Sequence, residues 1–261
     1  MTLIRIPYLQ AWDRMYRDQG LVILGVHSPE FAFEKDLTNL ARAMAELGVT
    51  WPVVQDNDFG IWNAFRNRYW PSHYLFDQEG KMVQKHFGEG AYMETEELIQ
   101  TLLGTAAPLE AKTLDRALAT PFKGPTTPET YLGTRRGRQD PWLIPKDGVF
   151  SPPAQLPLDA WNLEGPWVRM EESILLQGQG LLSLRYTARE LFMVAGTPEG
   201  KPVEIQIFRN GIPWDSPESP GGKIILGNKK LHRLLLLPAP EEGLLEIHGS
   251  GGVEIYTFTF G

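Results

Sequence analysis

Residues 21–26 read LVILGV, a short apolar run that is partly β-branched. Such a run is typical of a strand buried on both faces, as in a parallel sheet. A helix is predicted before it, over residues 7–18, because apolar residues recur there at helical spacing and Gly20 follows. A second helix is predicted after it, beginning at Ser28-Pro29-Glu30 and burying Leu37, Leu40, Ala41, Met44 and Leu47. The run is therefore one strand of an α/β arrangement.

The following residues continue the alternation of strands and helices. Short strands are predicted at residues 51–54 and 74–76, with a short helix at 59–65 between them. Residues 77–80 read DQEG, which indicates a turn, so residues 82–87 complete a hairpin. A last amphipathic helix buries Met93, Leu98, Ile99 and Leu102 and ends at Gly104. Residues 1–105 are therefore predicted to form one α/β domain.

Length and charge limit the classes of protein to consider. A chain of 261 residues exceeds the usual size of one domain and predicts two. The net charge of −7, without a basic stripe, gives no support to a nucleic-acid partner. The longest apolar runs fall far short of the roughly 20 residues that a membrane span needs, and no export signal is recognisable. There is no cysteine, so disulfides carry no information about compartment.

The second half has a different pattern. Residues 106–157 are rich in proline and are predicted to be an ordered linker that wraps a domain surface. Beyond Trp161 apolar and polar residues alternate, and Asn210-Gly211 predicts a two-residue hairpin turn. Strands are predicted at 173–176, 181–186, 190–194, 203–207, 223–226, 231–237, 244–248 and 253–260. Residues 158–261 are therefore predicted to form an all-β, jelly-roll-like sandwich.

Several stretches in order resemble one family. They are IPYLQAW at residues 6–12, GVHSPEF at 25–31, DND at 56–58 with WN at 62–63, NRYWP at 67–71 and TPETYLG at 127–133. The chain resembles the thioredoxin-like (TlpA-like) C-terminal region of DipZ-type proteins. In that family an extracytoplasmic thiol-disulfide oxidoreductase domain follows a membrane electron-transfer part.

The resemblance implies a missing active site. The family carries Cys-x-x-Cys at the start of the first helix, and Thr2 occupies the position of its second cysteine. The first cysteine and the strand in the middle of the sheet would lie before Met1. We therefore expect a chain without catalytic residues, in which Thr2 either caps the helix or is disordered. We also expect the strands at Leu21 and Tyr74 to pair directly, or to borrow a strand from another chain by dimerisation or strand exchange.

The resemblance also places a cis-proline at Pro71. The family binds an extended substrate segment beside this proline, which makes Trp70 and Pro71 candidates for a peptide-binding groove. The alternative is that Trp70 packs in the core. His27 and Glu30, and the set Asp56, Asp58 and His73, are polar groups near strand ends and turns. We interpret them as structural hydrogen-bonding groups, and no metal or other cofactor is predicted.

The last domain resembles a carbohydrate-binding module in fold. Its candidate glycan-binding rings are Trp161, Trp167, Trp214 and Tyr256, because flat rings can stack on sugars. Core packing of the same rings is the alternative, and no carboxylate pair indicates a glycosidase.

Two hypotheses follow. In the first, the chain is a truncated or cysteine-less thiol-disulfide oxidoreductase of DipZ type, redox-inactive as written, whose parent is extracytoplasmic and works with a membrane electron-transfer partner. In the second, it is a redox-silent module that binds an extended peptide, a glycan or a partner protein.

Overall fold

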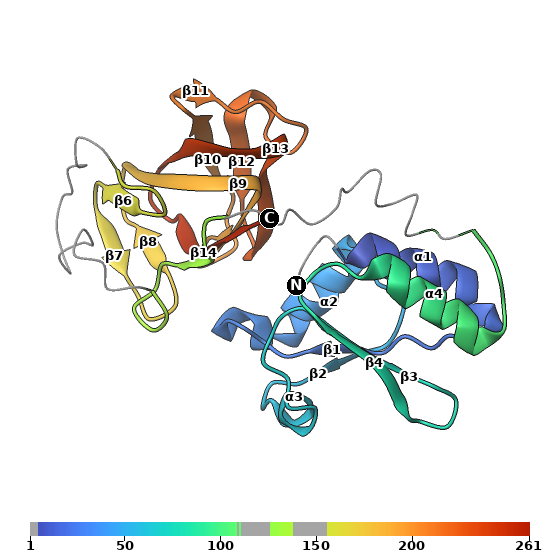
Figure 1. Ribbon diagram of the computed structural model, residues 1–261. Coiled ribbons are helices and arrows are strands. Elements are labelled where there is room, and N and C mark those ends of the chain that lie inside the picture. The colour runs from blue at the N-terminus through green and yellow to red at the C-terminus, as the bar shows by residue number, and fades with distance from the viewer. Residues whose placement is uncertain (1–4, 109, 111–125, 138–155) are drawn as a thin grey trace. The chain divides into compact units, whose positions relative to one another are not determined.

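A computed structural model describes residues 5–108, 110, 126–137 and 156–261, in two compact units, Met1–Pro121 and Phe122–Gly261 (Figure 1). Thr2 lies outside the described residues. The expected linker, residues 106–157, is described in part. Within it, the short strand β5 (Thr130–Tyr131) pairs with a strand of the second unit, and Leu132 is fully buried there.

The first unit has four α-helices among its described residues. They are α1 (Ile6–Tyr16), α2 (Leu37–Glu46), α3 (Gly60–Ala64) and α4 (Tyr92–Leu103), with short 3-10 turns η1 (Arg17–Gln19) and η2 (Ala32–Lys35). The predicted helix start at Ser28 was wrong. Asp36 is the N-cap of α2, because its carboxylate accepts the N–H groups of Thr38 and Asn39. Gly104, in the left-handed region, ends α4 as predicted.

The strands of the first unit form two separate sheets. Strand β1 (Gly25–His27) pairs in parallel with β2 (Val53–Gln55), and β3 (Ser72–Phe76) pairs antiparallel with β4 (Met82–Phe87). Among the described residues no ladder joins β1 to β3, so the expected direct pairing is not found. Strand exchange with another chain stays a prediction. The apolar run at residues 21–26 is only partly strand, because β2 pairs with residues 25–27 alone.

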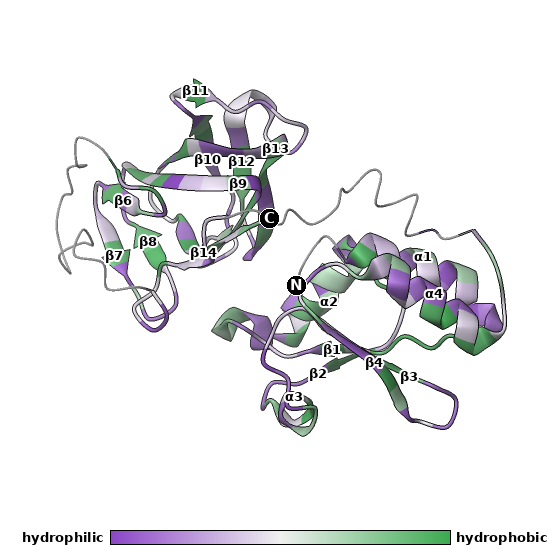
Figure 2. Ribbon diagram, viewed as in Figure 1, coloured by the Kyte–Doolittle hydropathy of each residue, from purple (hydrophilic) through white to green (hydrophobic). Residues whose placement is uncertain are grey.

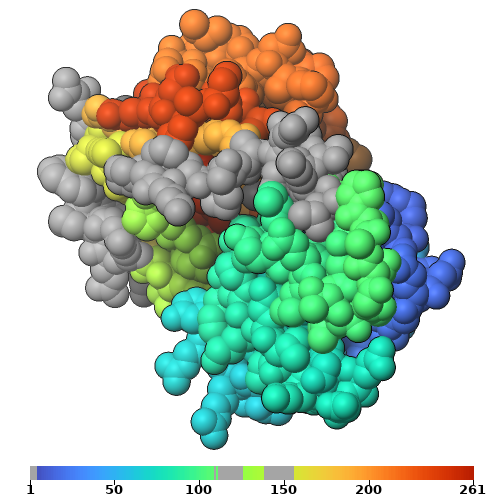
Figure 3. Space-filling view, turned by 45° about the vertical axis from the view of Figure 1, so that its right-hand side comes forward, coloured from blue at the N-terminus to red at the C-terminus, as the bar shows by residue number. Residues whose placement is uncertain are grey.

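Helices α1 and α4 pack against each other through aromatic rings. Tyr8 and Tyr92 stack with their ring centroids 3.7 Å apart, beside Trp12, Tyr16 and Ile99. In Figure 3 the surfaces of β3, β4 and α4, teal and green, lie beside each other.

The buried face of α4 is more polar than the sequence indicated. Glu96 accepts the hydroxyl of Tyr16 at 2.7 Å, and Gln100 donates to the same hydroxyl oxygen at 2.8 Å. Burial, together with Glu96, raises the pKa of Tyr16 to about 12. The interface between α1 and α4 therefore depends on hydrogen bonds as well as on apolar contacts.

The second unit is a single ten-stranded sheet whose pairings are all antiparallel in the described residues. With β5, its strands are β6 (Trp161–Glu164), β7 (Trp167–Arg169), β8 (Ile174–Leu176), β9 (Gly180–Gly196), β10 (Val203–Arg209), β11 (Ile212–Pro213), β12 (Lys223–Leu226), β13 (Lys230–Gly249) and β14 (Glu254–Phe260). The 3-10 turn η3 (Pro220–Gly222) precedes β12. Asn210 and Gly211 form the predicted turn, both at positive φ.

Two strands are longer than the sequence indicated. The predictions for 181–186 and 190–194 fall in the single strand β9, and those for 231–237 and 244–248 in β13. The register of this pair shifts between Arg233 and Leu235 and again between Leu236 and Glu241. Such bulges bend strands, so one long pair can turn around the core where separate strands were predicted.

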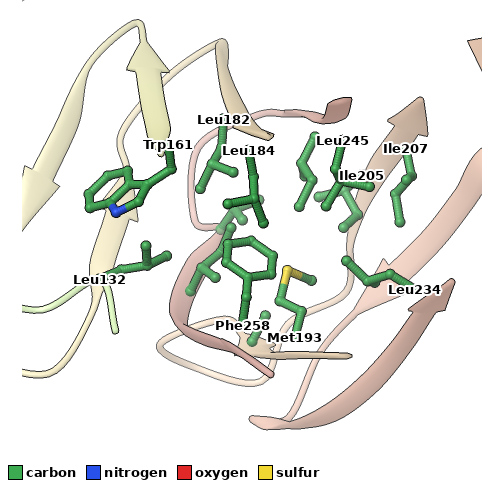
Figure 4. Packing of buried hydrophobic residues seen from close by; sticks show 14 of the residues in the cluster. Leu132, Trp161, Leu182, Leu184, Met193, Ile205, Ile207, Leu234, Leu245 and Phe258 are labelled. Atoms are coloured by element: carbon green, nitrogen blue, oxygen red, sulfur yellow. The ribbon is translucent and has the colours of Figure 1, made fainter. Parts of the chain in front are cut away.

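The bent sheet encloses one apolar core. Figure 4 shows Leu182, Leu184, Met193 and Phe258 pointing toward one another from β9 and β14. Residues from both ends of the sheet, including Trp167 of β7 and Ile224 of β12, belong to this cluster. In the described parts of the chain, none of the helices has the length and apolarity needed to cross a membrane.

Candidate functional site

The candidate site is built around the buried carboxylate of Asp56. This carboxylate accepts the N–H groups of Ile61 at 3.0 Å and Trp62 at 2.8 Å, and the hydroxyl of Ser28 at 3.1 Å. Burial by itself would raise the pKa of Asp56, but the hydrogen bonds from Trp62, Ile61 and Ser28 outweigh it, so the pKa lies below its usual value. Asp56 thus joins the start of α3 to the residue after β1.

This anchor positions a pair of tryptophans. Trp62 on α3 packs against Trp70, with ring centroids 4.3 Å apart. The indole N–H of Trp70 donates to the carbonyl oxygen of Ser28 at 3.0 Å. The Trp70–Pro71 peptide bond is cis, as expected. Trp70 is still 43% exposed, so it is fixed in place without being a core residue.

Trp70 is one of five exposed aromatic rings of the first unit, which together are named the aromatic surface. Its members are Phe65, Tyr69, Trp70, Phe76 and Phe87, each between 39% and 56% exposed. Tyr69 contacts Phe87 with centroids 5.3 Å apart, and Phe65 contacts Phe76 at 6.1 Å. Figure 2 shows hydrophobic residues, green, along α3 and β3. A clustered apolar surface of this kind is typical of an interaction site.

The other polar candidates of the first unit do not come together. The ring of His27 bonds the carbonyl of Glu34 at 3.1 Å, and burial lowers its pKa. Glu30 donates its N–H to the Glu34 carboxylate. The Nε2 atom of His73 lies 3.2 Å from the Thr95 hydroxyl on α4. Among the described residues no three His, Asp or Glu side chains are grouped as metal ligands.

The glycan candidates of the second unit are mostly buried. Trp161, Trp167 and Tyr256 each expose 5% or less of their surface, and Trp214 packs against the same core. Their burial agrees with the alternative that these rings pack in the core. Their role in sugar binding stays a prediction, and the buried rings expose little surface on which a sugar could stack.

One polar cluster was missed by sequence reasoning. Glu254 is 3% exposed, and its carboxylate accepts the hydroxyls of Ser173 and Tyr256, each at 2.8 Å. Lys229 forms an ion pair with it at 2.8 Å. Burial, followed by the charge of Glu254, raises the pKa of Tyr256 above its ordinary value. In the sequence, the one indication of this cluster was a charged residue, Glu254, within the strand predicted at 253–260.

Removing the Asp56 carboxylate should loosen the tryptophan pair. Asp56→Ala leaves two helix N–H groups and the Ser28 hydroxyl without their acceptor, so we expect a loss of about 1–3 kcal/mol from the first unit. Trp62 and Trp70 should separate, which a red shift of tryptophan emission would report.

Asp36→Ala is the matched control, because Asp36 also caps a helix but lies on the surface. It should cost about 1 kcal/mol and leave the emission maximum unchanged. Equal spectral changes in both variants would contradict the role of Asp56 as the anchor.

His73 should make the first unit sensitive to acid. Burial, then the charges of Arg5 and His86, lower the pKa of His73 from 6.5 to about 4. The unfolded chain takes up this proton near pH 6.5 and the folded chain only near pH 4, so stability is lost as pH falls through that window. We expect the melting temperature of the first unit to fall between pH 7 and pH 5, and His73→Gln to reduce that fall by roughly 5 °C.

The exposed His248 provides the control, since it lies on the second unit. His248→Gln should leave the pH dependence of the first unit unchanged. Parallel pH profiles for His73→Gln and the parent chain would rule out His73 as the sensitive group.

Comparison with known proteins identifies relatives over both units. A family model described as "Thioredoxin like C-terminal domain" matches residues 127–261. Protein DipZ of Mycobacterium tuberculosis (strain CDC 1551 / Oshkosh) is 32% identical over 267 residues, which cover 98% of this chain and 36% of DipZ. The chain therefore spans about a third of the length of that relative.

Two further matches cover a smaller share of this chain. Thiol-disulfide oxidoreductase YkuV of Bacillus subtilis (strain 168) is 32% identical over 85 residues, 33% of this chain and 55% of that protein. The solution structure of a thioredoxin-like protein in the oxidized form is 27% identical, with a TM-score of 0.37, and covers 41% of this chain and 73% of that one. The chain belongs to the thioredoxin-like C-terminal domain family, and Protein DipZ and a thiol-disulfide oxidoreductase are among its relatives.

Proposed function

We propose that this chain is the substrate-recognition part of a DipZ-type thiol-disulfide exchange protein and is redox-silent by itself. Exchange requires a thiolate to attack a disulfide sulfur and a second thiol to resolve the mixed disulfide. The 261 residues contain no cysteine, and methionine sulfur cannot form these bonds. In this proposal the thiols are supplied by another polypeptide segment, and the parent protein is extracytoplasmic with a membrane electron-transfer partner.

The single observation that carries the proposal is the fixed, half-exposed Trp70 within the aromatic surface. Its indole is held by Ser28 and Trp62, yet 43% of the residue is available to a ligand. Rigid tryptophan and tyrosine rings supply much of the binding energy at protein interfaces, since they bury a large area and lose little side-chain entropy. An extended peptide with apolar side chains fits this surface best.

We propose that the second unit is a sandwich similar in fold to a carbohydrate-binding module and that its role is structural. The support is its bent sheet around one core and the burial of Trp161, Trp167 and Tyr256. Rings inside a core stabilise the fold and are not available to stack on sugar.

The binding test uses the fluorescein-labelled, carboxymethylated B chain of insulin as an extended peptide. We expect saturable fluorescence anisotropy with the parent chain, and at least tenfold weaker binding for Tyr69→Ala and Trp70→Ala. Tyr69 is the more informative variant because it is 56% exposed. The control is Ile212→Ala, which removes a side chain of 69% exposure from the second unit. Unchanged affinity in both aromatic variants would contradict peptide binding at the aromatic surface.

The redox part is tested separately by reduction of insulin disulfides with dithiothreitol. The rate with this chain present should equal that of dithiothreitol alone. A rate that rises with protein concentration would contradict redox silence, whatever the binding test gives.

A further inference from the structure

All of the sulfur in this chain is methionine sulfur, because the sequence contains seven methionines and no cysteine. Two of the described methionines are well exposed, Met82 of β4 at 47% and Met170, between β7 and β8, at 42%. Met193 of β9 is fully buried. Methionine oxidises to its sulfoxide, and here no thiol competes for the oxidant. Of the methionines described, Met82 and Met170 are therefore the ones that a dissolved oxidant reaches most easily.

Met170 lies in the turn between β7 and β8, where hydrogen bonds hold its backbone. Its N–H donates to the carbonyl oxygen of Ser173 at 2.8 Å, and its carbonyl oxygen accepts the N–H of Thr134 at 2.9 Å. Its Sδ atom lies 3.8 Å from the Oγ atom of Ser173. Ser173 is itself only 1% exposed. Met170 therefore brings an accessible sulfur into contact with a buried hydroxyl.

The Ser173 hydroxyl connects this sulfur to the buried Glu254 carboxylate. It donates to Oε1 of Glu254 at 2.8 Å, and the same oxygen accepts the hydroxyl of Tyr256. Lys229 forms its ion pair with the other oxygen, Oε2. A hydroxyl has one proton to donate, and a thioether sulfur is a weak acceptor, so in the reduced chain Ser173 donates to Glu254. Met170 and Glu254 therefore lie beside one shared donor.

We propose that Met170 is a site of modification by hydrogen peroxide and that its oxidation changes the buried Glu254 cluster. The sulfur lone pair attacks one peroxide oxygen, so an S–O bond forms, the O–O bond breaks and water leaves. The sulfur loses two electrons, which the peroxide gains. The sulfoxide is polar, and its oxygen accepts hydrogen bonds much more strongly than the thioether does. In the oxidised chain Ser173 donates to this oxygen, and Glu254 loses one donor. This inference does not depend on the proposed function.

Mass spectrometry of the whole chain after treatment with hydrogen peroxide tests the modification itself. We expect Met170 and Met82 each to gain one oxygen atom. Met193 should react about tenfold more slowly, because the fold buries it. Unfolding the chain in denaturant before the treatment should remove this difference. A Met170 that reacts as slowly as Met193 in the folded chain would overturn the proposal.

Amide hydrogen exchange, followed by NMR, measures whether the oxidation reaches the interior. The amide of Leu176 donates to the carbonyl oxygen of Val253, so its exchange reports opening between β8 and β14. In Met82→Leu, peroxide should speed this exchange about tenfold, the expected effect of losing one hydrogen bond to a charged group. Met170→Leu is the matched control, because leucine has a similar volume and cannot be oxidised. Equal acceleration in both variants, or none in Met82→Leu, would contradict the proposal.

Adding Ser173→Ala to Met82→Leu tests whether the hydroxyl transmits the effect. Without the hydroxyl, oxidation of Met170 should change the exchange rate less than about twofold. A second measurement serves if this double variant does not fold. In oxidised Met82→Leu the NMR shift of the Glu254 carboxylate carbon should move, while that of the exposed Glu204 should not. Methionine sulfoxide reductases should restore the original shift. A constant Glu254 shift, or equal acceleration without the hydroxyl, would overturn the proposal.

Discussion

Replacing Trp167 with alanine is expected to lower the unfolding free energy of the second unit by about 3–5 kcal/mol. Trp167 is 3% exposed and lies in the main core cluster. Its indole N–H also donates to the carbonyl of Glu164 at 2.9 Å, so alanine removes a hydrogen bond and leaves a cavity. Denaturant unfolding followed by circular dichroism measures the loss.

Ile225→Ala is the control, because Ile225 on β12 is 58% exposed. It should change stability by less than about 0.5 kcal/mol. The outcome also bears on the predicted sugar site. A Trp167→Ala variant of normal stability that loses binding on a glycan array would contradict the core role and restore the glycan interpretation.

Replacing Glu254 with leucine is expected to cost the second unit about 3–5 kcal/mol, because it removes one partner of a buried ion pair. Lys229, only 21% exposed at its side chain, would keep its charge without this carboxylate. The hydroxyls of Ser173 and Tyr256 would also lose their shared acceptor. Denaturant unfolding at neutral pH measures the difference.

An exposed ion pair on the same sheet provides the control. Glu204 pairs with Lys223 at 2.9 Å, with side chains 50% and 53% exposed. Glu204→Leu should cost no more than about 1 kcal/mol, because surface pairs contribute little. Similar losses for the two variants would mean that burial of the Glu254 cluster has no energetic consequence.

The proposed function separates two parts of thiol-disulfide exchange that usually occur in one domain. In this proposal the extended substrate is positioned on a rigid surface formed by Trp62 and Trp70, which Asp56 anchors. Exchange of disulfides needs thiols, and this sequence contains no cysteine.

Much of the first unit could be predicted from local pattern. The helical spacing near Tyr8 and Trp12, the turn at Asp77 to Gly80 and the hairpin that follows depend on neighbouring residues. The start of α2 could not be located in this way. Both Ser28 and Asp36 are good N-cap residues, and only the fold placed the Ser28 hydroxyl against Asp56.

Two residues of the candidate site could be identified from the sequence, but their spatial arrangement could not. Trp70 and Pro71 were identified by resemblance, and the exposure of Trp70 was left open between groove and core. Its contacts with Ser28 and Trp62 join segments distant in sequence, so no local pattern contains them. The same holds for Glu254, whose partners Ser173 and Lys229 come from other parts of the sheet.

The sequence by itself determined the α/β and all-β halves, the hairpin turn at Asn210-Gly211 and the absence of cysteine, because periodicity, turn residues and composition are local properties. Only the tertiary structure decided which polar groups are buried together, where β9 and β13 bend, and that β1 and β3 remain unpaired with each other. These outcomes depend on which distant segments meet, and the free energy of such contacts is set by burial and register in the folded chain.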